Sequence, residues 1–303
     1  MKFLLDKLYK KTRGYYPFFK YCPAIYRNYY LKKRAFDFLG YEYNYEDPKT
    51  LNEKIRWLIY NEKFELKTKL TDKILVKGYI ASKIGKNHSA ELYGIYDNFE
   101  EIDFSVLPEK IAIKANHGWR MNIFVQNKSF IYKNYKQLVQ ITRKWLNTNY
   151  EDFSLEPQYR NIKRKLFVEQ LRETKDKIRC NEFQIYCFNS VPVYCEIRKI
   201  YNDNLYFPIF DTNWKLQNFT LTSNFNEEPI LCPERFEEML EYSKILSQGF
   251  SFARVDFVID GNDIHVVEIT FTPCSAMIPF LNYNIDLELG SKIKLPVNTD
   301  NTT

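Results

Sequence analysis

The chain has 303 residues, of which 45% are hydrophobic, so it is long enough for one large domain or two to three subdomains. Its six cysteines include no CxxC pair, and neither a cleavable signal peptide nor a long apolar run is present, so we expect a cytoplasmic protein. Only three histidines occur, which argues against a histidine-rich zinc site.

The net charge of +6 is concentrated at the N-terminus, because residues 1–34 carry ten Lys or Arg against the single acid Asp6. Met1–Lys11 has the pattern of an amphipathic basic helix, and aromatic residues follow it. One interpretation is a patch for an anionic membrane surface or a lipid-linked glycan, which would place the protein at the inner face of the membrane. The other is a helix that packs its aromatics on the body and leaves its lysines solvated. Nucleic acid is not an expected partner, because the basic excess is local and no nucleic-acid module is recognised.

Residues 51–86 predict two helices from the spacing of their apolar residues, with Asn52 and Thr71 as N-caps. Lys73 and Lys77 lie one turn apart in the second helix, as on an ordinary solvated face. A short strand is expected at residues 91–96.

Residues 110–126 predict a strand, a turn and a second strand. Lys114 ends the first strand, directly before Asn116-His117-Gly118. A lysine beside a turn with free backbone N–H groups could hold phosphates, although the turn alone could belong to any hairpin. Further on we expect helices at 132–150 and 233–248, a strand at 165–171, a hairpin of 183–188 with 191–197 about Asn189-Ser190, and a strand at 206–210.

Residues 252–272 alternate as a β-hairpin. In the first strand, Arg254 and Asp256 share one face, while the opposite face is apolar. In the second strand, alternation places Ile264, Val266, Glu268 and Thr270 on one face, and His265, Val267, Ile269 and Phe271 on the other.

A three-residue loop centred on Asn262 would set Asp256 opposite Glu268 and Arg254 opposite Thr270. Two carboxylates about 5 Å apart at Cβ destabilise a hairpin unless a positive charge lies between them. Magnesium is usually held by one or two carboxylates together with water and phosphate oxygens, so the hairpin predicts an ATP·Mg²⁺ site. The alternative is a solvated polar face.

The order of these segments resembles that of the ATP-grasp ligases, and within them the TupA-like branch associated with teichuronopeptide and surface-polysaccharide biosynthesis. The resemblance runs from about Leu51 to Gly290. The segments that carry it are Leu51-Asn52-Glu53-Lys54-Ile55 with Trp57-Leu58, Asp72-Lys73, Leu107-Pro108, Lys114-Ala115-Asn116-His117-Gly118, Val168-Glu169-Gln170, Tyr186-Cys187-Phe188-Asn189, Arg254-Val255-Asp256-Phe257, Glu268-Ile269-Thr270 and Leu289-Gly290.

The resemblance implies an α+β protein with the ATP-grasp fold. A helical N-terminal region and lead-in (1–105) would precede a small β-rich subdomain (106–175) and a larger antiparallel-sheet subdomain (176–303), with the nucleotide held between the last two. Lys73 and Lys114 would contact the nucleotide phosphates, and the loop residues Asn116 and Gly118 would help to hold them.

The resemblance also implies roles for the strands. The backbone of Glu169, Gln170 and Leu171 would read the adenine edge. Asp256 and Glu268 would bind Mg²⁺, with Thr270 at the position where many relatives have an Asn ligand. Arg254 would stabilise negative charge on the transferring phosphoryl group.

Two positions depart from the branch pattern. Trp119-Arg120 replaces a second glycine after His117-Gly118, which makes Arg120 a candidate phosphate contact. Gln184 stands where a lysine is usual, which removes a charge near the nucleotide and could alter or abolish activity. His117 is either a general base or a structural turn residue.

The function that the resemblance implies is ATP-dependent ligation of a carboxylate and an amine through an acyl phosphate. The substrates would be a carboxylate-bearing sugar or amino acid and an amine. Two alternatives are a kinase acting on a glycan or amino acid, and a non-catalytic module that binds nucleotide or glycan in polysaccharide assembly.

Overall fold

The structure is a computed structural model that describes residues 24–172, 182–201, 204–219, 230–260, 263–280 and 282–296. The basic helix expected at Met1–Lys11 lies outside the described residues. Among the helices that are described, none has both the length and the apolar character needed to cross a bilayer.

Four helices lead into the sheets: α2 (Ala24–Leu39), α3 (Leu51–Asn61), α4 (Phe64–Thr71) and α5 (Leu75–Ile84). The two helices predicted over residues 51–86 are found as α3 and α5, but the prediction missed α4 between them, and both predicted caps were wrong. Thr50 caps α3 in a reciprocal capping box with Glu53, while Asn52 lies within that helix. Thr71 ends α4, and the Asp72 carboxylate accepts from the N–H groups of Ile74 and Leu75 at the start of α5.

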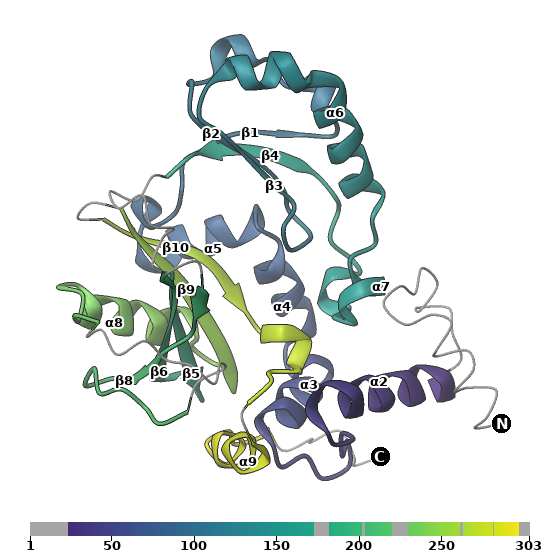
Figure 1. Cartoon of the computed structure of the whole chain (residues 1–303), viewed down its shortest axis with the longest axis vertical. Coiled ribbons are helices and arrows are strands. Elements are labelled where there is room, and N and C mark those ends of the chain that lie inside the picture. Colours follow the sequence, from purple (N-terminus) through teal and green to yellow (C-terminus); the bar gives the residue numbers. More distant parts are fainter. Residues whose placement is uncertain are drawn as a thin grey trace.

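The four-stranded antiparallel sheet has the order β1-β4-β2-β3. Its strands are β1 (Leu92–Tyr96), β2 (Ile111–Ala115), β3 (Asn122–Val125) and β4 (Leu166–Gln170). The long helix α6 (Lys128–Asn147) lies over this sheet and packs Ile131 and Leu138 into the core beneath it (Figure 1). Because β1 pairs with β4, the sheet begins before residue 105, where the sequence suggested a subdomain boundary.

The second antiparallel sheet has the order β10-β9-β5-β6-β7, with β8 also paired to β6. Its strands are β5 (Glu182–Phe188), β6 (Val191–Tyr201), β7 (Asn204–Tyr206), β8 (Ile209–Asp211), β9 (Phe252–Asp260) and β10 (Asp263–Thr270). The turn at Asn189-Ser190 has φ of 50° and 66°, as a tight two-residue hairpin requires. The single strand expected at 206–210 is divided into β7 and β8 around Pro208, which has no N–H to donate to a ladder.

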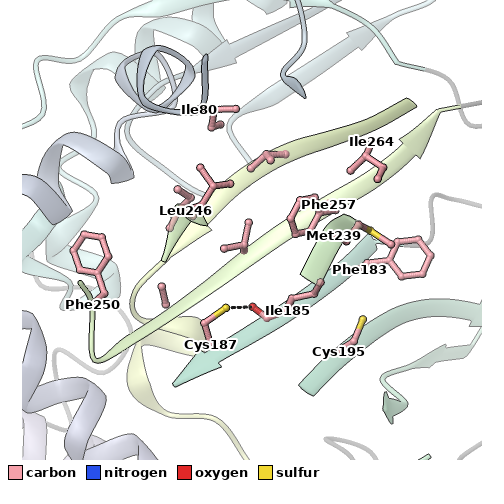
Figure 2. Close-up of a cluster of buried hydrophobic side chains, with 14 of the residues drawn as sticks. Ile80, Phe183, Ile185, Cys187, Cys195, Met239, Leu246, Phe250, Phe257 and Ile264 are labelled. Atoms are coloured by element: carbon pink, nitrogen blue, oxygen red, sulfur yellow. Dashed lines mark hydrogen bonds between the residues drawn. The ribbon is translucent and has the colours of Figure 1, made fainter. Parts of the chain in front are cut away.

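The apolar face of the larger sheet packs against α4, α5 and α8 (Phe236–Leu246). Figure 2 shows side chains of this cluster, with Ile80 from α5 and Met239 from α8 set against Ile185, Phe257 and Ile264 of the strands. The opposite face is apolar only at one end, where α3 and α9 (Tyr283–Ser291) cover Phe188 and Phe252. Its other end carries the polar residues described below.

The predicted pairing of the last hairpin is confirmed at its polar end: Asp256 lies opposite Glu268, and Arg254 opposite Thr270. Nearer the turn, the prediction that Ile264 and Val266 share a face with Glu268 is wrong, because a bulge between Val266 and Glu268 inserts one residue into β10. Ile264 and Val266 therefore join Ile269 and Phe271 in the core. Val267 is 42% exposed, and Glu268 is left on the polar face.

Candidate functional site

Three adjacent strands bring polar side chains together on one face of the larger sheet. Gln184 of β5 lies opposite Asp256 of β9, which in turn lies opposite Glu268 of β10. The Gln184 amide donates to Asp256 (Nε2 to Oδ2, 3.2 Å), and the Thr270 hydroxyl donates to Glu268 (Oγ1 to Oε1, 3.0 Å). Alternation places Gln184 and Asp256 on this face, and the bulge in β10 brings Glu268 into register with Asp256.

Arg254 lies between the two carboxylates. Its guanidinium forms two hydrogen bonds to Asp256 (Nε to Oδ1, 2.7 Å; Nη2 to Oδ2, 2.6 Å), and Nη2 is 3.8 Å from Glu268 Oε1. The Arg254 and Asp256 side chains are only 11% and 5% exposed, which strengthens the pair. A cation thus occupies the space between the carboxylates, as the sequence argument required.

The two carboxylates differ in their electrostatic environment. Burial, reinforced by the neighbouring Glu268 carboxylate and opposed by Arg254, raises the pKa of Asp256 to about 7. The ammonium of Lys73, 3.0 Å from Glu268 Oε2, lowers the pKa of Glu268 to about 2. Glu268 is therefore ionised at neutral pH, and additional positive charge would favour ionisation of Asp256.

Lys73 is held by its backbone in the turn between α4 and α5. Its N–H donates to the Asn116 carbonyl (3.1 Å), and the Asn116 amide donates to Asp72 Oδ2 (2.9 Å) and to the Lys163 carbonyl (3.0 Å). Asn116 Oδ1 accepts from the Lys165 N–H (2.9 Å). Asn116 was predicted to contact the nucleotide. The structure instead uses its side chain to fix the turn that presents Lys73.

A second ion-pair cluster connects the smaller sheet to α5. Glu169 of β4 pairs with Lys114 of β2 (2.5 Å) and with Lys77 of α5 (2.7 Å). Although burial opposes it, the two ammonium groups lower the pKa of Glu169. The sequence analysis assigned Lys77 to a solvated face, yet its side chain is only 16% exposed. Its spacing of four residues from Lys73 does not distinguish a buried lysine from a solvated one, so no local signal identified it.

The segment predicted to read adenine ends the strand β4. The Gln170 N–H already donates to the Glu91 carbonyl (2.9 Å). Leu171 is the first residue after the strand, so its backbone lies beyond the ladder. Of the three predicted residues, Leu171 alone follows the end of this strand.

The remaining predicted residues lie in the loop between β2 and β3. His117 is buried, with Nε2 3.1 Å from the Trp145 carbonyl and Nδ1 3.3 Å from Asn116 Oδ1, and burial lowers its pKa to about 4. These contacts favour the structural role over that of a general base. Arg120 is exposed and stacks on Trp119, with Cζ 4.1 Å from the ring centroid.

Gly118 lies in close contact with two side chains. A Cβ at this position would lie 2.6 Å from the Met121 sulfur and 3.1 Å from the Tyr150 ring. The flexible end of Met121 could turn away, so the packing favours a small residue here without requiring glycine.

The model of the family described as TupA-like ATP-grasp matches residues 53–294. No curated protein matches the sequence significantly.

Solved structures with similarity to the chain include the D-alanine–D-alanine ligase from Helicobacter pylori, at 16% identity over 75% of this chain and 61% of that chain, with a TM-score of 0.42. The D-alanine–D-alanine ligase from Bacillus anthracis is 15% identical over 67% of this chain and 57% of that chain, with a TM-score of 0.38. N5-carboxyaminoimidazole synthetase from Staphylococcus aureus, complexed with ADP, is 13% identical over 66% of this chain and 43% of that chain, with a TM-score of 0.38. The chain thus spans about three fifths of the length of the D-alanine–D-alanine ligases that it matches. The family match, which covers most of the chain, confirms the predicted α+β ATP-grasp fold: this protein belongs to the TupA-like ATP-grasp family.

Proposed function

We propose that the protein is an ATP-dependent carboxylate–amine ligase that forms an amide through an acyl phosphate. The observation that carries this proposal is the placement of two ion-pair clusters on the two sheets: Lys73 pairs with Glu268, which lies opposite Asp256, and Lys77 and Lys114 pair with Glu169. The hydrogen bond from the Lys73 N–H to the Asn116 carbonyl joins the turn before α5 to the end of β2. Such a set of cations and carboxylates suits a substrate that carries both phosphates and a divalent metal.

The residues present fit Mg²⁺ bound with ATP. Asp256, Glu268 and Thr270 offer the hard oxygen atoms that this ion prefers. In the structure, Arg254 and Lys73 already neutralise the two carboxylates, which shows that the position demands positive charge. When bound there, Mg²⁺ would neutralise negative charge on the phosphate oxygens of the nucleotide.

The basic residues would act on the nucleotide. Lys73 pairs with Glu268 of the larger sheet and Lys114 pairs with Glu169 of the smaller sheet, and each could exchange this carboxylate for phosphate oxygens. Arg254 would turn from Asp256 toward the negative charge that develops on the transferring phosphoryl group. Gln184 holds Asp256 in place and adds no charge. Leu171 would place its backbone against the adenine edge.

The chemistry requires no nucleophile from the protein. A carboxylate oxygen of the substrate attacks the γ-phosphorus of ATP, the bond to the bridging oxygen breaks, and ADP leaves. The amine then attacks the acyl carbon, inorganic phosphate leaves, and the amine loses a proton to solvent. The protein contributes by positioning the reactants and compensating their charge.

The substrates that we propose are a uronic acid or amino-acid component of a bacterial surface polysaccharide and an amine. Support comes from the pathway with which the TupA-like branch is associated and from the basic excess of residues 1–34, which suits an acidic glycan. The same excess supports a peripheral location at an anionic membrane.

Trapping with hydroxylamine tests the reaction. The purified protein is incubated with ATP, Mg²⁺ and a panel of uronic acids, nucleotide-sugar acids and amino acids, with hydroxylamine replacing the amine. We expect phosphate release that depends on one class of carboxylate, together with a hydroxamate identified by mass. Recovery of a stable phosphorylated acceptor without any hydroxamate would identify a kinase instead, and absence of ATP turnover with the whole panel would contradict both activities.

A further inference from the structure

One buried carboxylate on the polar face of the larger sheet has no part in the reaction proposed above. Glu196 of β6 lies opposite Gln184 of β5, so it extends the row of Gln184, Asp256 and Glu268 by one strand. The residues before and after it point into the core on the other face of the sheet. At 2% exposure, Glu196 is the least exposed residue of this row.

Glu196 has a tyrosine as its partner. The Tyr186 hydroxyl donates to Glu196 Oε2 over 2.9 Å. Within the part of the chain that the structure describes, no lysine, arginine or histidine forms an ion pair with Glu196. A buried carboxylate is unfavourable unless a positive charge compensates it. The position of Glu196 therefore suits a cation that the structure holds elsewhere.

Arg254 is connected to Glu196 through the Tyr186 ring. Tyr186 lies opposite Arg254 in the ladder between β5 and β9, and Arg254 Cζ is 6.0 Å from the ring centroid. The hydroxyl of the same ring is bonded to Glu196. Arg254 also opposes the rise that burial causes in the pKa of Glu196. Arg254 thus has a further carboxylate within electrostatic reach, on the side of β9 away from Glu268.

Binding of a divalent cation would change what Arg254 requires. Both Asp256 oxygens accept from Arg254, so a metal ion that binds Asp256 competes with the guanidinium. A buried guanidinium without a counter-charge is strongly unfavourable. Glu268 cannot become the new partner, because it is the second proposed metal ligand and already pairs with Lys73.

We propose that Glu196 is a positioning residue that takes over Arg254 when Mg²⁺ and nucleotide occupy the site. Glu196 holds one edge of the guanidinium, and the other edge faces the transferring phosphoryl group. Glu182, on the same face, already has a cation of its own in Arg198 (3.7 Å). This role rests on the proposed function for the identity of the ligand, and it adds the residue that keeps Arg254 paired and oriented.

Calorimetric titration of the full chain with a non-hydrolysable ATP analogue tests the role of Glu196. Each variant is titrated in EDTA and again in excess Mg²⁺, and the ratio of the two Kd values gives the gain in affinity due to the metal. Glu196→Gln keeps the shape of the side chain and an acceptor for the Tyr186 hydroxyl. It should leave the Kd in EDTA within about twofold of the wild type and reduce the metal-dependent gain by about tenfold or more.

Substitution of Arg254 separates this role from simple attraction of the metal by a nearby negative charge. In an Arg254→Gln background Glu196 has no guanidinium to hold, so adding Glu196→Gln should change the metal-dependent gain by less than about twofold. Direct attraction between Glu196 and Mg²⁺ would persist in that background.

Glu156→Gln is the matched control. Glu156 is also buried and accepts from hydroxyls, those of Thr272 and Ser275, but it lies outside the row that contains Glu196. Its metal-dependent gain should equal that of the wild type.

A metal-dependent gain that Glu196→Gln leaves unchanged, or an equal loss of affinity in EDTA and in Mg²⁺, would overturn the proposed role of Glu196 alone. So would an undiminished effect of Glu196→Gln in the Arg254→Gln background. A wild-type protein whose affinity for the analogue Mg²⁺ does not increase would instead contradict the metal site of the proposed function, and the role of Glu196 with it.

Discussion

Glu268→Gln is expected to lower ATP turnover by about two to three orders of magnitude while leaving the fold intact, the range found when one preorganised charge contact at an active site is removed. The substitution keeps the shape of the side chain but removes the charge that Lys73 and the metal would share. The Glu268 side chain is 33% exposed, so Lys73 can turn to solvent and little stability should be lost. Steady-state phosphate release and a urea denaturation curve measure the two quantities.

Glu238→Gln in α8 is the matched control, because the Glu238 side chain has a similar exposure (30%) and also pairs with one cation, Arg235 (2.6 Å). Its turnover should stay close to that of the wild type. Asp256→Asn is a less direct test, because it would leave the buried Arg254 guanidinium without its counter-charge, which costs about 3 kcal/mol or more in stability. Equal turnover by the Glu268→Gln and Glu238→Gln variants would contradict a metal-binding role for Glu268.

Gly290→Ala is expected to lower the free energy of unfolding by about 3 kcal/mol, near the upper end for overpacking a core. A Cβ at residue 290 would lie 2.1 Å from the Lys49 carbonyl oxygen and 2.7 Å from the Leu51 nitrogen. Both contacts are backbone atoms at the start of α3, so no side-chain rotation can relieve them. Urea denaturation followed by circular dichroism gives the value.

Gly78→Ala in α5 provides the control for that prediction. A Cβ there would meet no atom within 4 Å, so the alanine should stabilise the helix by about 0.5 to 1 kcal/mol. Opposite signs for the two substitutions would show that α9 packs directly on α3. Similar small effects would mean that these helices are farther apart than the structure places them.

The polar hairpin could be predicted from the sequence because alternation alone decides which side chains share a face. The pairing of Asp256 with Glu268 was predicted from an assumed three-residue loop, but the structure reaches it differently. Next to the turn, Asp263 pairs with Asp260, which is one residue away from the predicted register. The bulge between Val266 and Glu268 then shifts the pairing by one residue, so that Glu268 lies opposite Asp256 as predicted. Bulges depend on tertiary packing and leave no dependable trace in periodicity.

The roles of Lys77 and Asn116 could not be predicted, because each depends on contacts between separate elements. Lys77 meets Glu169 across the gap between α5 and β4, and Asn116 meets Asp72 across 44 residues of sequence. Local alternation predicted that Asp256 and Glu268 share a face, but the contacts of Lys73 and Lys77 with carboxylates on other elements appear only in the assembled fold.

The most direct test of the ATP·Mg²⁺ site is a crystal structure of the full chain with a non-hydrolysable ATP analogue and Mn²⁺, located by its anomalous scattering. We expect an anomalous peak within ligand distance of both the Asp256 and the Glu268 carboxylates. The phosphates of the analogue should contact Lys73 and Lys114, and Arg254 should have turned away from Asp256. A nucleotide and metal bound elsewhere, with Arg254 still on Asp256 and Lys73 still on Glu268, would contradict it.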